Sequence, residues 1–340
     1  MRAAALNWLT SQGVALPLAA FLLIGAIVFL SGARLTRHAD AIADASALGR
    51  LWIGTLLLAA STSLPELTTD VSAAALRAPN LGIGDLMGSS LANMLILALL
   101  DLIYFRRRVL DDISRNHLLV GVLAIILTAL AGLDMATRSH GAFGPIGIGS
   151  ALIVIIYLLG MRAVRAELPE ATPPVQLPLG ATRRNVLRKA IVGFAAVTAV
   201  LGLATPALVL SAEALARTSG LGETFVGTLL VGLTTSIPEG VTIIAAVRLG
   251  ALDLAAGNAF GSNAFNMCIL LAMDLASPTG PVLPQAAPAN LIGAQLAVLV
   301  TAMILLRILT PRSRTIGRWR PESLLVLIAY ATAIWLLAPS

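Results

Sequence analysis

The sequence predicts an all-α membrane protein of ten transmembrane helices, arranged as two inverted five-helix repeats with broken helices at the midplane. Composition is the first reason: 58% of the 340 residues are hydrophobic and only 12% are charged, against about 25% charged residues in an ordinary soluble domain. The mean hydropathy is +0.90. A gapless internal repeat and a one-sided distribution of arginines are the other two reasons.

Ten apolar windows, most of roughly 17–25 residues, define the predicted spans. The segment before the first window lacks a basic region followed by a cleavable apolar core, so this window is expected to remain as a helix. The second and seventh windows carry the repeated proline motif, and the third and eighth carry the repeated Gly-Ser pair. The windows cover residues 15–33, 51–76, 81–105, 118–133, 143–161, 190–216, 224–249, 252–275, 289–309 and 323–338.

The longest polar interruption lies between the fifth and sixth windows and holds four prolines. Its composition is typical of a linker. The expected organisation is therefore a first five-helix repeat at residues 1–161, a cytoplasmic linker at residues 162–189, and a second five-helix repeat at residues 190–340. Each repeat carries one copy of a cation-binding motif.

Basic residues fall unequally on the two sides of these ten windows. One side receives 19 of the 23 Lys and Arg residues, and the other receives only Arg2, Arg77, Arg138 and Arg217. The side richer in Lys and Arg is normally cytoplasmic, so both termini are expected outside the cytoplasm. The Arg-biased basic set and the short loops are typical of an integral protein of a bacterial cytoplasmic membrane.

The internal repeat aligns residues 54–102 with residues 227–275 at a fixed offset of 173, and 22 of the 49 positions are identical. Five spans per half is an odd number, so the second half enters the membrane from the opposite face. The two copies are then related by a pseudo-two-fold axis in the membrane plane, as in inverted-repeat transporters. The motif copies are expected to converge near mid-membrane.

The first motif element is Thr-Ser-Leu/Ile-Pro-Glu, with its prolines at Pro65 and Pro238. A proline inside a helix removes a hydrogen bond from the carbonyl of the preceding turn. We therefore expect free carbonyls around residues 59–61 and 232–234, followed by hydroxyls and one carboxylate. Such oxygen atoms are ligands of hard cations such as Ca²⁺ and Na⁺.

The second element, Gly-Ser-x-x-x-Asn, adds a serine and an asparagine on one helix face at i,i+4. If neighbouring helices carry the two elements, their oxygens form one cage. A buried carboxylate is expensive in a membrane, and its presence in both copies favours function over chance. The predicted ligands are Thr62, Ser63, Glu66, Ser89, Asn93, Thr235, Ser236, Glu239, Ser262 and Asn266.

Five further acidic residues are interpreted separately. Asp70 is either a ligand or proton relay beside Glu66, or an attracting charge in a water-filled vestibule. Asp85 is assigned to a helix start or entrance. Asp101 and its repeat counterpart Asp274 suggest interfacial positions, Asp101 through an ion pair with Arg106, Arg107 or Arg108, and Glu213 is expected to pair with Arg217 at i,i+4.

The paired motifs resemble the two α-repeats of the calcium/cation antiporter superfamily, which includes the sodium/calcium exchangers. The resemblance implies ten helices in two inverted halves, and exchange of Ca²⁺ against Na⁺ or H⁺ by alternating access. By matching position, Glu66 and Glu239 would be the shared central carboxylates. The chain departs from the family pattern because Asn93 and Asn266 are both neutral, and because aspartates stand at positions 70 and 85, often Ser and Asn in the family.

The predicted function is a secondary antiporter that exchanges Ca²⁺ for Na⁺ at a two-glutamate site, with H⁺ as the alternative coupling ion and a cation channel as a remote alternative. A membrane enzyme is disfavoured because the chain has no HExxH or GxSxG motif and no Cys/His ligand set. We expect no cofactor, with the lipid bilayer and the transported cations as partners. No nucleic acid and no obligatory protein partner are implied.

Overall fold

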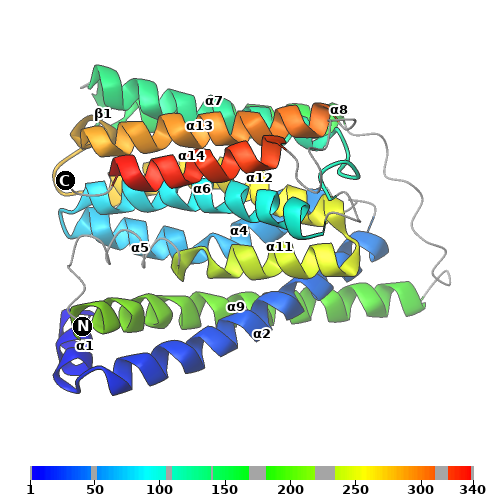
Figure 1. The fold of residues 1–340 in the computed structure, drawn as a ribbon, viewed down its shortest axis with the longest axis horizontal. Coiled ribbons are helices and arrows are strands. Elements are labelled where there is room, and N and C mark those ends of the chain that lie inside the picture. Colours follow the sequence, from blue (N-terminus) through cyan, green and yellow to red (C-terminus); the bar gives the residue numbers. More distant parts are fainter. Residues whose placement is uncertain are drawn as a thin grey trace.

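The computed structural model of the chain describes residues 2–46, 52–104, 109–138, 141–167, 181–218, 234–310 and 321–337, and they form a helical bundle with one small hairpin (Figure 1). The hairpin pairs β1 with β2 in antiparallel fashion. The elements are α1 Arg2–Ser11, α2 Ala15–Ala45, the π-helix η1 Ile53–Leu58, α4 Ala59–Thr62, α5 Leu64–Ala75, α6 Pro79–Ile103, α7 His117–Thr137, β1 Ala142–Phe143, β2 Ile146–Gly147, α8 Ile148–Glu167, α9 Ala181–Thr218, α11 Ile237–Leu249, α12 Leu252–Ala276, the 3₁₀-helix η2 Leu283–Gln285, α13 Pro288–Leu309 and α14 Pro321–Leu337.

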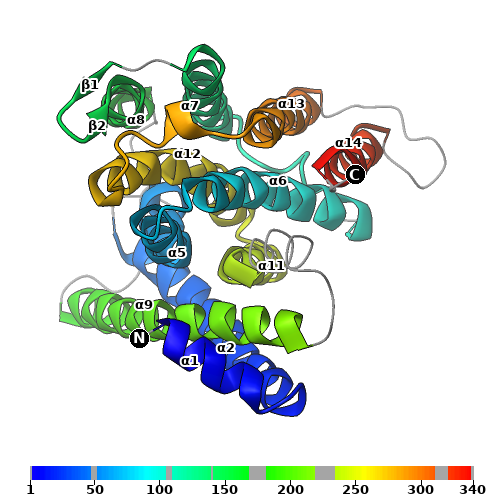
Figure 2. The ribbon, with the colours of Figure 1, turned by 90° about the vertical axis from the view of Figure 1, so that its left-hand side faces the viewer.

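The helices form three groups, which are clearest from the end of the bundle (Figure 2). On one side α2 and α9 lie against each other, with α1 beside them. The middle holds α5, α6, α11 and α12, and the other side holds α7, α8, α13 and α14. Most of the surface of α2 and α9 is left uncovered by the rest of the protein, whereas α6 and α12 are the most buried spans. The middle group therefore supplies the interior of the bundle.

The outer helices α2 and α9 are longer than the sequence predicts. Their 31 and 38 residues correspond to about 46 and 57 Å at 1.5 Å per residue, whereas the hydrocarbon core is about 30 Å thick. The apolar windows stop at the first arginines, but these residues are good helix formers and the helices continue through them. The helix α1 was also not predicted.

Seven of the described helices are long and apolar enough to cross a membrane. The other three predicted spans fall below this length for different reasons. The second is divided into η1, α4 and α5, the described part of the seventh begins at residue 234 and yields the 13-residue α11, and the tenth yields the 17-residue α14. The structure therefore establishes a helical membrane protein, and the count of ten spans remains a prediction.

The 173-residue offset extends beyond the aligned motifs. Residues 117–137 of α7 and residues 290–310 of the α13 region are identical at seven of 21 positions, without a gap. Equivalent threonines near the ends of these segments make equivalent bonds: Thr137 Oγ1 donates to Leu133 O at 2.9 Å, and Thr310 Oγ1 donates to Leu306 O at 2.8 Å. At one pair of equivalent positions the charge is reversed, with Asp134 in α7 and Arg307 in α13.

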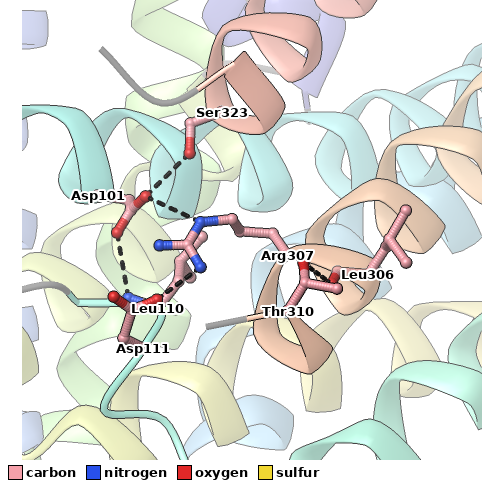
Figure 3. A network of polar contacts seen from close by, with 7 residues as sticks. All are labelled: Asp101, Leu110, Asp111, Leu306, Arg307, Thr310 and Ser323. Atoms are coloured by element: carbon pink, nitrogen blue, oxygen red, sulfur yellow. Dashed lines mark hydrogen bonds and ion pairs between the residues drawn. The ribbon is translucent and has the colours of Figure 1, made fainter. Parts of the chain in front are cut away.

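Arg307 is 1% exposed and lies at the centre of a buried polar network (Figure 3). Its Nη1 atom is 2.5 Å from Asp111 Oδ1, and its Nε atom is 3.8 Å from Asp101 Oδ2. Asp101 also accepts hydrogen bonds from Leu110 N at 3.2 Å and Ser323 Oγ at 2.9 Å. This network joins α6, α13, α14 and the segment that follows α6.

Two of the predicted ion pairs can be compared with these contacts. Glu213 and Arg217 pair as expected, with 2.9 Å between Oε1 and Nη2. Asp101 has Arg307 as a cationic neighbour, which the sequence did not suggest. The residues first expected beside Asp101, Arg106 to Arg108, lie outside the described residues.

Replacing Arg307 by methionine should destabilise the protein by about 3–5 kcal/mol, because Asp101 and Asp111 would lose their buried countercharge. Thermal unfolding of the purified protein in detergent measures this change. Arg34→Met is the matched control, because Arg34 is an exposed arginine of α2. Equal melting temperatures for the two variants would contradict the assigned role of the network.

Candidate cation site

Both copies of the proline motif sit where a helix begins again after a break. Ser63 has φ −84° and ψ 8°, and Ser236 has nearly the same values, φ −80° and ψ 2°. Each serine immediately precedes a helix, α5 or α11, and the proline lies in that helix's first turn. Proline is well tolerated at this position because its missing N–H would have no helical partner there.

This geometry corrects one expectation from the sequence. The prolines were predicted to interrupt helices from inside and to free the carbonyls around residues 59–61. Instead, the carbonyl of Ala59 accepts hydrogen bonds from Ser63 N at 3.0 Å and Thr62 Oγ1 at 3.2 Å. The predicted segment 232–234 is described only at Thr234. The carbonyl of Ala59 is therefore not one of the free carbonyls expected in the first copy.

Glycines let the first broken helix lie directly on α12. A Cβ atom added to Gly261 would fall 2.7 Å from the Cα atom of Thr55 in η1, and one added to Gly54 would fall 2.8 Å from the carbonyl oxygen of Leu254. Real Cβ atoms do not approach other atoms so closely, so only glycine fits here. The close approach brings the helix that carries Ser262 against the broken segment that carries Thr62.

Glu66 and Glu239 are both 0% exposed and interact electrostatically with each other. Each takes a hydrogen bond from a serine: Ser63 Oγ donates to Glu239 Oε1 at 3.3 Å, and Ser89 Oγ donates to Glu66 Oε1 at 3.3 Å. Ser236 Oγ in turn donates to Ser89 Oγ at 3.0 Å. The two motif copies therefore meet at the two glutamates.

Two threonine contacts repeat across the copies. Thr62 Oγ1 donates to Asn258 Oδ1 at 3.2 Å, and Thr235 Oγ1 donates to Asp85 Oδ1 at 3.0 Å. Thr62 and Thr235 are equivalent at the offset of 173, as are Asp85 and Asn258. Thr62 also lies 3.5 Å from Ser262 Oγ. Each broken helix therefore contacts the unbroken helix of the opposite copy.

The predicted asparagines are fully buried but are not used alike. Asn93 Nδ2 donates to Asn263 Oδ1 at 2.9 Å, and Asn263 Nδ2 donates to Ser90 O at 3.2 Å. Ser90 and Asn263 are equivalent positions in the repeat. Asn93 Oδ1 and both polar side-chain atoms of Asn266 have no hydrogen-bond partner among the described residues.

Asp85 corrects a second expectation. It was assigned to a helix start or entrance, yet α6 begins at Pro79 and Asp85 is 4% exposed. Its Oδ1 atom accepts the hydrogen bond from Thr235, and its carboxylate lies within electrostatic reach of Asp70. Asp70 is fully buried one turn beyond Glu66, within its electrostatic reach. The burial of Asp70 favours the ligand or relay interpretation over a vestibule.

The site has more oxygen atoms than donors to satisfy them. Within the described part of the chain, Glu66 Oε2, Glu239 Oε2 and Asp85 Oδ2 accept no hydrogen bond, and no Lys, Arg or His forms an ion pair with these carboxylates. Among these residues no three Asp, Glu, His or Cys side chains are grouped as a metal centre. A cation held here would therefore also need the hydroxyl and amide oxygens as ligands.

The sequence predicted most of this arrangement and missed three participants. The two motif elements supply predicted residues that contact each other across the two copies, such as Ser63 with Glu239 and Ser236 with Ser89. Asp85 was misassigned, and Asn258 and Asn263 were not selected. The signal that could have found them was the repeat itself, because each stands at the 173-residue offset from a polar residue of the first copy.

A helical membrane protein with buried carboxylates between two broken helices has the architecture of a secondary ion transporter. Comparison with known proteins identifies the group within that class. The family model described as "Sodium/calcium exchanger protein" matches residues 16–164 and 189–338. The chain therefore belongs to the sodium/calcium exchanger family, a family of membrane cation antiporters.

Individual relatives and solved structures agree with this family. Inner membrane protein YrbG of Escherichia coli (strain K12) is 28% identical, over 78% of this chain and 82% of YrbG. Sodium/calcium exchanger MaX1 of Methanosarcina acetivorans is 23% identical, over 74% of this chain and 81% of MaX1. The structure of the sodium-calcium exchanger NCX_Mj soaked with 10 mM Na⁺ and zero Ca²⁺ matches the fold with a TM-score of 0.73, at 20% identity over 96% of this chain and 100% of NCX_Mj.

Gly261→Ala should lower the stability of the protein by about 1–3 kcal/mol, the usual effect of forcing extra atoms into a packed contact. The equivalent residue of the first copy, Gly88, provides the control, because a Cβ atom there meets nothing within 4 Å in the described structure. Melting temperatures of the two purified variants test the contact. A Gly88→Ala variant as destabilised as Gly261→Ala would show that the close approach to Thr55 is not the cause.

Proposed function

We propose that the chain exchanges Ca²⁺ for Na⁺ by alternating access at a central site shared by Glu66 and Glu239. The observation that carries this proposal is the meeting of the two buried glutamates, where a serine of the first copy bonds the glutamate of the second. Two carboxylates balance one divalent ion or two monovalent ions. Competition between one Ca²⁺ ion and two Na⁺ ions for the same carboxylates is the physical basis of the proposed exchange.

The other site oxygens complete the proposed coordination. Ca²⁺ takes six to eight oxygen ligands and accepts neutral oxygens together with carboxylates. The unsatisfied oxygens of Asn93 and Asn266 suit this role. The proposed ligands are Glu66, Glu239, Thr62, Ser63, Ser89, Asn93, Thr235, Ser236, Ser262, Asn266 and Asp70.

The proposed architecture is ten spans in two inverted halves, residues 1–161 and 190–340, joined by a cytoplasmic linker at residues 162–189. The reciprocal threonine contacts support a two-fold relation between the halves. The described chain ends lie at the same end of the bundle, as an even number of spans requires (Figure 1). We place both termini outside the cytoplasm of a bacterial cell, on the basis of the arginine distribution.

A second candidate keeps the site and replaces Na⁺ by H⁺. The observation that favours it is that Asp70 and Asp85 are both buried and lie within electrostatic reach of each other, since one proton on such a pair removes their mutual repulsion. The second copy has Ile243 and Asn258 at these positions. The extra acidic groups therefore belong to one half only.

Glu66→Gln and Glu239→Gln should each reduce Ca²⁺ uptake into proteoliposomes to the background level, because either change removes half of the charge that balances the cation. Glu213→Gln is the matched control, since Glu213 forms an ion pair with Arg217 away from the site. Uptake by either site variant at the rate of the control would disprove the two-glutamate site.

The coupling ion is tested in the same vesicles with an outward Na⁺ gradient or an outward H⁺ gradient as the only driving force. We expect Ca²⁺ uptake with the Na⁺ gradient. Uptake driven by the pH gradient alone would establish the H⁺-coupled alternative. Uptake that needs no counter-ion would instead indicate a channel.

A further inference from the structure

We propose that Asp134 and Asp274 form a second binding site, for a divalent cation, at the end of the bundle that carries β1 and away from the central site. Asp134 lies in the last turn of α7 and Asp274 in the last turn of α12, and these two helices pack together. Asp274 follows Asn266 by eight residues, or about 12 Å along the helix. The site is therefore separate from the proposed transport site.

The two carboxylates lie within electrostatic reach of each other and carry the same charge. Asp274 is satisfied by backbone donors: Gly147 N at 2.9 Å to Oδ2, and Val282 N at 2.7 Å to Oδ1. Asp134 is 9% exposed, and within the described chain no donor or cation binds its carboxylate. A nearly buried carboxylate beside a second one, without a donor, is stabilised by a bound cation, which offsets the repulsion between the two charges.

The start of α8 is shaped around both carboxylates. An added Cβ atom on Gly147 would lie 3.3 Å from Asp274 Oδ2, and one on Gly149 would overlap the carboxylate of Asp134. Ser150, one turn after Gly147, is 1% exposed and its hydroxyl has no partner among the described residues. The positive end of a helix is equivalent to roughly half a charge, so α8 alone does not neutralise two carboxylates.

At the opposite end of the bundle, the position equivalent to Asp134 carries a positively charged side chain. Arg307 is equivalent to Asp134, and Asp101 is equivalent to Asp274. There α13 packs on α6, and the Arg307 guanidinium lies between Asp101 and Asp111 (Figure 3). At the Asp134 end the arginine is replaced by a carboxylate, so the fixed charge is lost and a free cation takes its place. Two carboxylates from different helices suit Ca²⁺, a hard ion of charge two.

Binding of Ca²⁺ to the purified full-length protein tests this site in a background in which Glu66 and Glu239 are both changed to Gln. In that background we expect Ca²⁺ still to bind and to raise the melting temperature. Asp134→Asn should weaken this binding at least tenfold. Asp134→Arg should abolish both the binding and the Ca²⁺-dependent shift, and should leave the melting temperature without Ca²⁺ unchanged or higher, because it introduces the cation that Arg307 supplies at the other end.

The control is Asp112→Asn, which removes an exposed carboxylate and should leave Ca²⁺ binding unchanged. Asp274 is not varied, because its loss would also break two backbone hydrogen bonds. No Ca²⁺ binding in the double-glutamine background, or equal binding by the Asp134→Asn variant, would overturn the proposal. Transport by the single glutamate variants is a separate measurement, so the central site and this site can fail independently.

Discussion

Two fully buried glutamates that form no ion pair with a Lys, Arg or His of the described residues are the constraint on which the centre of this protein depends. Removing a carboxylate from water costs several kcal/mol even after relaxation. Ser63 and Ser89 each satisfy one oxygen of a glutamate, and the other oxygen of each accepts no bond from the described residues. A site with this imbalance is stable when it is loaded with positive charge and unfavourable when it is empty. In an antiporter this difference has a function, because it discourages the empty site from crossing the membrane.

The broken helices offset part of the free-energy cost of burying the two glutamates. Glu66 and Glu239 each lie in the first turn of the helix that begins after the break, where the helix dipole favours negative charge by about 0.3–1 kcal/mol. This contribution is smaller than the cost of burial, so the dipole orients the carboxylates and does not replace a cation. The breaks also bring Thr62 and Thr235 into contact with the opposite copy. The same backbone feature therefore positions the charge and joins the two halves.

The sequence predicted the helical membrane fold and the meeting of the motif copies, because hydropathy and the repeat report directly on both. It failed where the outcome depends on tertiary packing. Asp85 was placed at an entrance because its distance from a helix start was read from an apolar window, whereas its neighbour Thr235 comes from the other half of the chain. The length of α2 was underestimated because hydropathy marks the lipid boundary and not the end of a helix. The ten spans and their inversion remain predictions.

Residues that differ at equivalent positions of the two repeats show which side chains the shared helical fold does not require. Equivalent positions occur in helices that pack in similar ways, so the fold alone does not call for opposite charges at them. Yet Asp134 of the first copy is equivalent to Arg307 of the second, which reverses the charge. Asp85 is equivalent to Asn258, which removes the charge. The first exchange leaves one end of the bundle held by a buried guanidinium and the other end with two carboxylates. Two halves of similar sequence therefore place different charges at the two ends of the bundle, which two identical halves could not do.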